Sequence, residues 1–500
     1  MKKTIVVIIL SLITFVSKAQ NSNTKTATTV FSDSQSYNWL WAVKAEAFGG
    51  SQGHIEKFVT TDSKGNIIVL GYFYSKSITF GSCTLTNTDR EYSSDIYLVK
   101  YDNSGKVLWA KSIIGGSSEY PYSVCIDAIG NIIVTGVYQS PAIHLGTFFL
   151  KNYTDNNGLE VEEYDKETGF IAKYDSSGNI LWAQNIGGVS KCYPEAVTTD
   201  SNENIIIAGS FKSPYISFKD TKLMNKDSAD NSWDWFLSKF DPKGKFLWAE
   251  SAGGIYNESP HSVSVDADEN ILVSGVYNSP DIPFGSSILT RTDRYGDEFF
   301  LAKYNSSGNA LWAKSLGGKL THNSYSIANY KNGNSVLLGY YEKPIIDSDS
   351  TISYDNRVLG MLLVKYDEHG NIIWEKTTED TFLDFTHSVV IDSFGNIIVT
   401  GSFSSPTLTF GDTKLSSLGN CDIYVAKYDS SGNSIGAQSV GGSSADVFRS
   451  VAIDSKGNII VLGYFESDII TFGNTTLTNK CCKNEGTIFV AKLGSSHAQK

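Results

Sequence analysis

The feature of this sequence that most constrains its fold is an internal repeat. Tryptophans recur at intervals of 62 to 73 residues, and Gly436 follows the last of them by a further 62. The phrases between them return in a fixed order, which in one copy reads Leu-Trp-Ala-Lys-Ser, Gly-Gly, Ser-Val-Cys-Ile-Asp, Gly-Asn-Ile-Ile-Val-Thr-Gly and Phe-Ile-Ala-Lys-Tyr-Asp. The tryptophans are Trp41, Trp109, Trp182, Trp248, Trp312 and Trp374. With Gly436 in the seventh place, the chain contains seven copies of one unit.

Each copy contains four short segments rich in Ile, Val, Tyr and Phe, which is typical of β-strands. In one copy we name them strand A (Ser123–Asp127), strand B (Asn131–Tyr138), strand C (Gly169–Asp175) and strand D (Asn179–Ile186). The phrase Asp-x-x-Gly-Asn joins A to B, and Tyr-Asp-x-x-Gly joins C to D. Because the aspartate can bond its own downstream backbone and the glycine can adopt a positive φ, both connections are expected to be tight hairpins.

The two ends of the repeat indicate that the units close into a ring. The last copy stops after its third strand, Thr487–Leu493, and the first begins with an orphan fourth strand, Trp39–Lys44. Placing these two segments side by side completes the seventh unit, whereas a linear solenoid would need polar caps. The sequence therefore predicts an all-β fold: a seven-bladed β-propeller with four-stranded antiparallel blades, closed by the N-terminal strand that completes the last blade.

The first residues predict a targeting segment outside the fold. Lys2 and Lys3 precede an apolar run from Thr4 to Val16, which is shorter than the roughly 20 residues of a membrane span. We predict a signal peptide over 1–19, a polar linker over 20–36, the propeller over 37–493 and a short polar tail over 494–500. The expected location is periplasmic, secreted or cell-surface, and no membrane span is expected.

The charge balance excludes some partners. Removing residues 1–19 takes away three lysines and no acid, which changes the formal charge from −12 to −15. A surface that binds duplex nucleic acid needs clustered Lys and Arg, so nucleic acid is not an expected partner. Six cysteines do not make a disulfide scaffold in a chain of this size. A bridge from Cys421 to Cys481 or Cys482 stays open.

Several positions repeat so regularly that a structural role is expected. The strand B glycine suits close approach between adjacent blades, and the strand D tryptophans are expected to dock between blades. A strand C lysine recurs in all seven copies, and we interpret it as a structural residue that snorkels rather than as a ligand-binding ring. These lysines are Lys100, Lys173, Lys239, Lys303, Lys365, Lys427 and Lys492.

The phrases Asp-Ile-Tyr-Leu-Val-Lys-Tyr-Asp-x-Ser-Gly-x-x-Leu-Trp-Ala-Lys, Asp-x-x-Gly-Asn-Ile-Ile-Val-x-Gly and Thr-Phe-Gly-x-x-x-Leu resemble the SBBP-type bacterial β-propeller repeat. The resemblance covers residues 37–493 and implies a secreted or cell-surface propeller, in a family without one established activity. The Tyr-Asp-x-x-Gly-x-x-Leu-Trp phrase is also similar to the tryptophan-docking repeat of quinoprotein propellers, which commonly have eight blades. No separate cofactor constellation accompanies it, so no cofactor is predicted on that ground.

The lengths of the connections distinguish the two faces of the ring. The A–B and C–D turns are short in every copy and define the short-turn face, whereas the longer D–A and B–C connections emerge together on the long-loop face. Ligand sites on repeat scaffolds usually lie on such variable loops, so we expect any site on the long-loop face.

One variable position stands out at the start of strand A. Two residues before the Val or Ile of the Ser-Val phrase, the side chain is polar in every copy but differs between copies. Because A is the innermost strand, these residues are expected at the channel mouth, where varied polar groups suit a small ligand, glycan or metal. Strand starts beside a wet channel are also polar for no functional reason. This rim set is Lys57, Tyr122, Glu195, His261, Tyr325, His387 and Arg449.

Catalytic and metal roles are weaker hypotheses. His261, His387 and Glu195 are the candidates for acid–base chemistry, although His261 and His387 lie in non-adjacent blades. The acidic segment 155–163 offers Asp155, Glu160 and Glu162 as Ca²⁺ ligands, or is simply a solvated loop. No Gly-x-Ser-x-Gly, His-Glu-x-x-His or Walker motif occurs.

The sequence therefore leaves three functions open. The first is an exported binding module that engages a glycan, peptide or partner protein through its long-loop face, and is not an enzyme. The second is a propeller lyase or hydrolase acting at the channel mouth. The third is a structural repeat protein without a small-molecule site.

Overall fold

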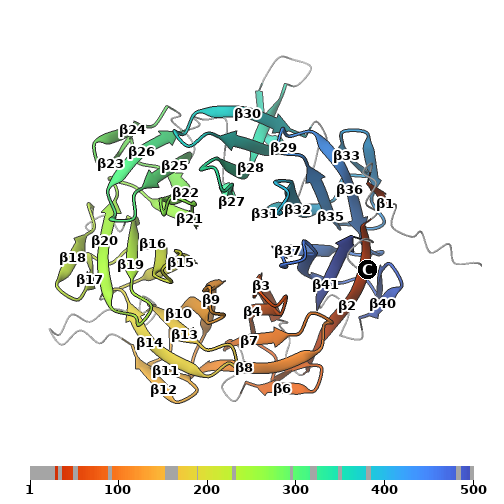
Figure 1. Ribbon diagram of the computed structural model, residues 1–500, viewed down its shortest axis with the longest axis horizontal. Helices are drawn as coiled ribbons and strands as arrows, with labels where there is room; N and C mark the ends of the chain where they lie inside the picture. Colours follow the sequence, from red (N-terminus) through yellow and green to blue (C-terminus); the bar gives the residue numbers. More distant parts are fainter. Residues whose placement is uncertain are drawn as a thin grey trace, which may run out of the picture.

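Seven antiparallel sheets surround a central axis, and all secondary structure in the described part of the chain is β-strand (Figure 1). The computed structural model describes residues 29–31, 37–48, 54–87, 93–152, 167–188, 190–227, 232–292, 297–315, 324–346, 352–378, 385–479 and 486–495. Within each blade the strands run in the order A, B, C, D from the axis outward. The predicted seven-bladed propeller is confirmed.

The two inner strands of each blade follow the expected spacing. From blade 1 to blade 7, strand A is β3 (His54–Thr61), β9 (Glu119–Ile126), β15 (Cys192–Thr199), β21 (Glu258–Val265), β27 (Ser324–Asn329), β31 (Phe385–Ile391) and β37 (Asp446–Ile453). Strand B is β4 (Ile67–Phe73), β10 (Ile132–Tyr138), β16 (Ile205–Phe211), β22 (Ile271–Tyr277), β28 (Ser335–Ile346), β32 (Ile397–Phe403) and β38 (Ile459–Phe465).

The two outer strands complete the blades. In the same order, strand C is β7 (Asp95–Tyr101), β13 (Thr168–Tyr174), β19 (Asp234–Phe240), β25 (Glu298–Tyr304), β29 (Ile352–Tyr366), β35 (Asp422–Tyr428) and β41 (Thr487–Ser495). Strand D is β8 (Val107–Gly115), β14 (Ile180–Ile186), β20 (Phe246–Ala252), β26 (Ala310–Ser315), β30 (Ile372–Thr377), β36 (Ser434–Val440) and, from the N-terminus, β2 (Tyr37–Phe48).

The ring closes as predicted, through the N-terminal strand. β2 pairs antiparallel with β41, with Trp39 opposite Leu493 and Lys44 opposite Phe489. A second N-terminal strand, β1 (Thr29–Phe31), lies within the stretch predicted as linker and pairs with β36, the outer strand of blade 6. The predicted signal peptide lies outside the described residues, as do Cys481 and Cys482 of the predicted bridge.

A two-stranded hairpin fills the B–C connection in six blades, where the sequence predicts only a variable loop. Its first strand pairs with strand D of the preceding blade where β5 meets β2 and β11 meets β8. The hairpins are β5–β6 (Ser77–Phe80, Cys83–Thr86), β11–β12 (Ala142–Leu145, Phe148–Lys151), β17–β18 (Tyr215–Phe218, Thr221–Met224), β23–β24 (Asp281–Phe284, Ser287–Thr290), β33–β34 (Thr407–Phe410, Thr413–Ser416) and β39–β40 (Ile469–Phe472, Thr475–Thr478). Each hairpin lies at the periphery of the ring (Figure 1).

The hydrophobic core is divided among the interfaces between blades. Seven clusters of buried side chains each join two neighbouring blades, such as the one that combines Leu70 and Leu98 of blade 1 with Val134 and Phe170 of blade 2. Strands B and C are buried on both faces for this reason, whereas strand D alternates. Every blade therefore depends on both neighbours.

The repeated strand C lysines are structural, but they do not snorkel to water. Lys100 is 3% exposed, and its ammonium lies 3.0 Å from the Asp62 carboxylate of its own A–B turn. It also donates a hydrogen bond to the Ser176 carbonyl in the C–D turn of the next blade. The same ion pair recurs in six blades, as Asp62–Lys100, Asp127–Lys173, Asp200–Lys239, Asp266–Lys303, Asp392–Lys427 and Asp454–Lys492.

The strand D tryptophans dock on the following blade, as predicted. The Trp109 indole donates to the Ser176 carbonyl, which also accepts from Lys100, and the ring lies against Gly178 of that turn. The tryptophans are half-buried rather than part of the core, and all six make this bond.

Gly436 replaces the seventh tryptophan because its docking partner is missing. Blade 7 takes strand C from the end of the chain and strand D from the start, so no C–D turn joins them. Tyr37 fills the vacant place instead: Lys427 donates to its hydroxyl over 2.8 Å and Gln438 donates to its carbonyl over 2.9 Å. The exception in the repeat therefore marks the point of closure.

Candidate functional site

The rim set has one structural position in all seven blades: it lies in a β-bulge of strand A. The A–B register shifts between Glu56 and Phe58 in blade 1, and the corresponding shift spans the rim residue in every other blade. A bulge leaves its residue out of the ladder and re-aims its side chain, and bulges are common beside functional sites. The variable polar residue of strand A is therefore also the residue that leaves the regular A–B ladder.

The strand B glycine is explained by this bulge, which corrects the expectation of contact between blades. A Cβ atom on Gly136 would lie 2.6 Å from the Tyr120 carbonyl oxygen and 2.8 Å from the Phe170 ring. Both groups belong to the same blade as Gly136. The glycine thus leaves space for the bulged strand on one side and an aromatic side chain of strand C on the other.

Adjacent A strands are linked by the serine that follows the rim position. Ser123 accepts a hydrogen bond from the Val197 N–H of the next blade over 3.2 Å, and Ser450 accepts one from Val59 N–H over 3.1 Å. These bonds satisfy backbone groups on the inner edge of strand A, which has no fifth strand beside it. The channel wall that carries the rim set is fixed by them.

Aromatic side chains gather at the mouth between blades 2 and 3. The rings of Tyr122 and Tyr193 stack with centroids 5.4 Å apart, and Trp233 lies 4.7 Å from Tyr193. All three are half-buried, so part of each ring faces solvent. Tyr122 was predicted here, whereas Tyr193 and Trp233 were not. Trp233 lies outside the 62-to-73-residue tryptophan period, which was a usable signal.

A second aromatic group continues the row toward blade 1. Tyr72 of β4 contacts Tyr74 and Tyr120 edge to face, at centroid distances of 5.6 and 5.1 Å. Tyr120 lies on the same strand, β9, as Tyr122 of the first group. We call the six residues together the aromatic row: Tyr72, Tyr74, Tyr120, Tyr122, Tyr193 and Trp233.

Polar side chains border the aromatic row. Glu167, just before β13, accepts hydrogen bonds from the Tyr193 hydroxyl and, over 2.7 Å, from the Gln139 amide. Burial, followed by the hydrogen bond to Glu167, raises the pKa of Tyr193, and burial followed by the Glu195 charge raises that of Tyr122. Both hydroxyls therefore stay neutral and able to donate. Glu167 was not among the predicted residues.

Glu195 links blades 3 and 4. Its carboxylate accepts hydrogen bonds from Ser210 over 2.5 Å and from Ser259 of the next blade over 3.0 and 3.1 Å. Burial raises its pKa to about 7, although the two serine hydroxyls oppose the shift. A carboxyl group that titrates near neutral pH can both donate and accept a proton.

The structure does not bring the whole rim set to one point. Arg449 lies in blade 7 with its guanidinium over the Tyr464 ring, at 5.1 Å. His261 is half-buried on β21, beside the Glu195 partner Ser259 in sequence. The side chains of Lys57, Tyr325 and His387 lie outside the described residues, and so do the proposed Ca²⁺ ligands Asp155, Glu160 and Glu162.

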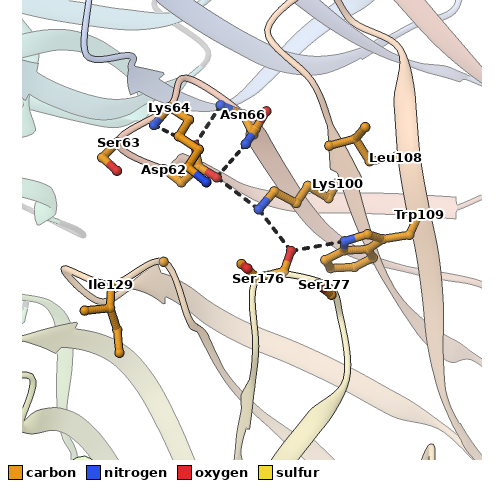
Figure 2. A pocket seen from close by; sticks show the side chains of 11 residues that line it. Asp62, Ser63, Lys64, Asn66, Lys100, Leu108, Trp109, Ile129, Ser176 and Ser177 are labelled. Atoms are coloured by element: carbon orange, nitrogen blue, oxygen red, sulfur yellow. Dashed lines mark hydrogen bonds and ion pairs between the residues drawn. The ribbon is translucent and has the colours of Figure 1, made fainter.

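A pocket also opens on the short-turn face, between blades 1 and 2. Figure 2 shows its floor, where Lys100 bridges Asp62 and the Ser176 carbonyl and Trp109 shares that carbonyl. Leu108 and Ile129 are exposed at its edge. Because the charges at its floor already satisfy one another, this pocket belongs to the blade-docking contacts.

Two features are absent from the described part of the chain. No helix there has the length and apolar character required to cross a membrane. No group of three or more His, Cys, Asp or Glu side chains converges there as a metal site.

Comparison with known proteins supports a propeller repeat but shows no family. No protein-family model matches the chain. It is 26% identical over 533 residues to an uncharacterized WD repeat-containing protein of Acanthamoeba polyphaga mimivirus, covering 91% of this chain and 38% of that one. It is also 26% identical over 236 residues to the regulatory protein FlaEY of Caulobacter vibrioides, covering 46% of this chain and 23% of that one. The chain spans less than half the length of these relatives.

The solved structures that resemble the chain are remote. The Pan2 WD40 domain of Neurospora crassa is 7% identical with a TM-score of 0.42, covering 91% of this chain and 97% of that one. A polysaccharide lyase is 11% identical with a TM-score of 0.43, covering 93% and 94%. At such values these likenesses carry no argument about function.

Proposed function

We propose that this chain is an exported, SBBP-type binding module that engages a glycan at the channel mouth on its long-loop face. One observation carries the proposal: each blade places one variable polar residue in a strand A bulge, while the phrase that follows it recurs from copy to copy. A scaffold that keeps its packing residues constant and varies one re-aimed residue per blade is suited to recognition.

The aromatic row favours a glycan over a peptide. The half-buried rings of Tyr122, Tyr193 and Trp233 offer apolar faces to a sugar. Glu167 and Gln139 beside them offer acceptors and donors for its hydroxyl groups. Glycan sites combine such apolar surface with a few fixed polar groups. The row spans blades 1 to 3, which places the expected ligand on one sector of the mouth.

The test compares aromatic residues on the two faces. Trp233→Ala and Tyr122→Ala are expected to lower affinity at least tenfold for a glycan selected from an array of neutral and uronic-acid oligosaccharides. Phe394→Ala is the matched control, because Phe394 is an aromatic residue on the short-turn face and 80% exposed. Calorimetric titration gives the affinities. Equal affinity in all four proteins would overturn the proposal, and selective binding of peptides would favour the protein-partner alternative.

One observation favours an enzyme as the second candidate. Glu195 has a pKa near neutrality, its charge acts on Tyr122, and it accepts hydrogen bonds from Ser259, on the same strand as the predicted acid–base residue His261. This arrangement suits a lyase or hydrolase that moves a proton at the mouth. Incubation with the bound glycan, followed by assay of reducing ends and unsaturated products, tests it. Turnover by the wild type that Glu195→Gln abolishes, with binding retained, would establish the enzyme; no turnover leaves the binding module.

A further inference from the structure

The interfaces of blades 3–4 and 6–7 each contain a pair of buried carboxyl groups near the long-loop face. Asp234 begins strand C of blade 3 and lies beside Glu258, which begins strand A of blade 4. Asp422 of blade 6 and Asp446 of blade 7 repeat the arrangement. All four residues are at most 1% exposed. The Asp234–Glu258 pair adjoins the aromatic row, because Asp234 follows Trp233 and the Glu258 N–H donates to the Trp233 carbonyl over 2.7 Å. The Asp422–Asp446 pair, in blades 6 and 7, lies in a different sector of the ring.

These carboxyl groups lack the countercharge that the chain provides elsewhere. Six buried aspartates of the A–B turns each form an ion pair with a strand C lysine. Among the described residues, none of the four inter-blade carboxyl groups forms an ion pair. A buried charge is normally paired, neutralised by a proton or bound to a metal.

The hydrogen bonds at each pair are unequal in the same way. Glu258 accepts from the N–H groups of Gly254 and Ser279 over 2.9 and 3.2 Å, one at each oxygen. Asp234 accepts from Lys226 N–H at Oδ2 over 2.8 Å, but its buried Oδ1 has no hydrogen-bond partner within the described structure.

The blade 6–7 pair shows the same asymmetry. Asp446 accepts from Ser467, through both its N–H and its hydroxyl, the latter over 2.8 Å. Asp422 accepts from Leu418 N–H at Oδ2, while its buried Oδ1 has no partner in the described part of the chain. In each pair, one buried carboxylate oxygen therefore accepts no hydrogen bond within the described structure: Oδ1 of Asp234 and Oδ1 of Asp422.

The Gly-Gly phrase places this oxygen against the backbone. A Cβ atom on Gly253 would overlap Asp234 Oδ1, and one on Gly441 would overlap Asp422 Oδ1. Backbone oxygens approach the second glycine: the Ile469 carbonyl would lie 2.5 Å from a Cβ on Gly442. Carboxylate, serine and carbonyl oxygens thus meet at this turn, and oxygen ligands of this kind suit a hard cation.

The acids also occur together within the repeat. At the blade 1–2 interface, Asp95 begins strand C and Glu119 begins the next strand A. At the blade 2–3 interface neither position is acidic, since Thr168 is followed by Cys192. At the blade 4–5 interface, Glu298 begins strand C but the next strand A begins with Ser324, so paired acids are a feature of particular interfaces.

We infer that the Asp234–Glu258 and Asp422–Asp446 pairs each bind one Ca²⁺ ion between adjacent blades. Two carboxylates match the charge of a divalent cation, and serine and backbone oxygens complete a flexible coordination shell. Such a site cross-links neighbouring blades near the long-loop face. A proton shared between the carboxyl groups is the competing explanation, since burial raises the pKa of Glu258 and Asp446 to about 7.

The experiment uses the full chain treated with EDTA, dialysed and titrated with CaCl₂ at constant ionic strength. Thermal unfolding is expected to shift upward with Ca²⁺, and calorimetric titration to show at least two sites. Terbium provides a direct readout, because the buried Trp235 adjoins Asp234 and is expected to sensitise terbium luminescence at that site.

Isosteric variants assign the sites. Asp234→Asn and Asp422→Asn each keep the shape of the side chain and are expected to remove one site, and the double variant to remove both. Asp367→Asn, in a solvent-exposed C–D turn, is the control and is expected to retain both sites. No Ca²⁺ shift in the wild type, or a shift unchanged in the double variant, would overturn the inference. A stability gain on acidification without any Ca²⁺ response would identify the shared proton instead.

Discussion

At the scale of single residues, the repeated lysines show what sequence can and cannot predict. Their recurrence at one position in seven copies indicates a structural role, and the structure agrees. Their partners were missed because the aspartate had already been assigned to its own turn. Asp127 in fact does both: one oxygen holds the turn and the other holds Lys173 at 2.9 Å. Sequence shows each motif separately, whereas the blade brings the two together.

Blade 5 lacks this ion pair, because Tyr330 takes the place of the turn aspartate opposite Lys365, and it therefore provides a control. Lys173→Met is expected to destabilise the protein by about 3–5 kcal/mol, because Asp127 is left charged and buried. Lys365→Met is the matched control, since its ammonium lies 4.2 Å above the Tyr330 ring and no aspartate is left behind. That variant is expected to cost only about 1–2 kcal/mol. Urea unfolding measures both, and equal losses would contradict the assignment.

The carboxyl groups predict an unusual pH dependence. The folded-state pKa is raised to about 7 for Glu195, Glu258 and Asp446, so the folded protein binds protons more tightly than the unfolded chain. The free energy of unfolding should therefore fall as pH rises from about 5 to 7, by at least about 1.4 kcal/mol, the value of one pKa unit.

The turn aspartates act in the opposite direction at lower pH. Hydrogen bonds to Asn66 and Lys100 lower the pKa of Asp62 despite its burial, so its contribution is lost only when pH falls below the usual range of aspartate. Maximum stability is thus expected near pH 4–5. Chemical denaturation in EDTA across the pH range checks this; a maximum at pH 8 would contradict it.

At the scale of elements, strands and tight turns were predictable, but the hairpins of the B–C connections were not. Strands B and C have long apolar runs, and strands A and D are marked by phrases that recur from copy to copy, whereas a hairpin such as Ser77–Phe80 with Cys83–Thr86 has only four residues per strand. Its second partner, strand D of the preceding blade, is distant in the sequence. Nor could the bulges be predicted, because a bulge is defined by the register with strand B.

Two A–B turns use glutamate where the others have glycine. Glu203 and Glu269 both adopt φ of 64°, in the left-handed region that costs roughly 1 kcal/mol for a non-glycine residue. Glu203→Gly is therefore expected to stabilise the protein by roughly that amount. Gly130→Ala, at φ 92° in the corresponding turn of blade 2, is expected to destabilise the protein. A Cβ atom has space at this position, so the loss would come from backbone strain and not from a steric clash. Shifts in the urea midpoint test both.

At the scale of the whole molecule, closure was predictable because the copy number and the two incomplete ends agree. The channel mouth was only partly predictable. Tyr122 and Glu195 were identified by alignment, but their neighbours Tyr193, Trp233 and Glu167 come from other elements and join them only in the folded ring. A site assembled from several blades has no single sequence motif.

Because β2 alone closes the ring, the stability of the protein is expected to drop sharply once an N-terminal truncation reaches β2. Removing residues 1–28 leaves β1 and β2 intact and should leave the melting temperature nearly unchanged. Removing residues 1–48 deletes β2, exposes the edge of β41 and empties the Tyr37 place beside Lys427. That variant is expected to lose cooperative unfolding and to aggregate. Circular dichroism and gel filtration compare the two; cooperative, monomeric unfolding without β2 would contradict the closure.

The pairing of Tyr37 with Ser495 also fixes how the ring is presented to its surroundings. Strand C runs toward the short-turn face, so the β41 end and the β2 start emerge together there. A tag, bead or neighbouring domain joined after β41 is therefore attached on the short-turn face. The opposite side, with the aromatic row, then points outward. The N-terminal side differs, because β1 runs antiparallel to β36 and its first residue, Thr29, lies toward the long-loop face. Coupling through the C-terminal end should therefore orient every molecule on a sensor chip the same way.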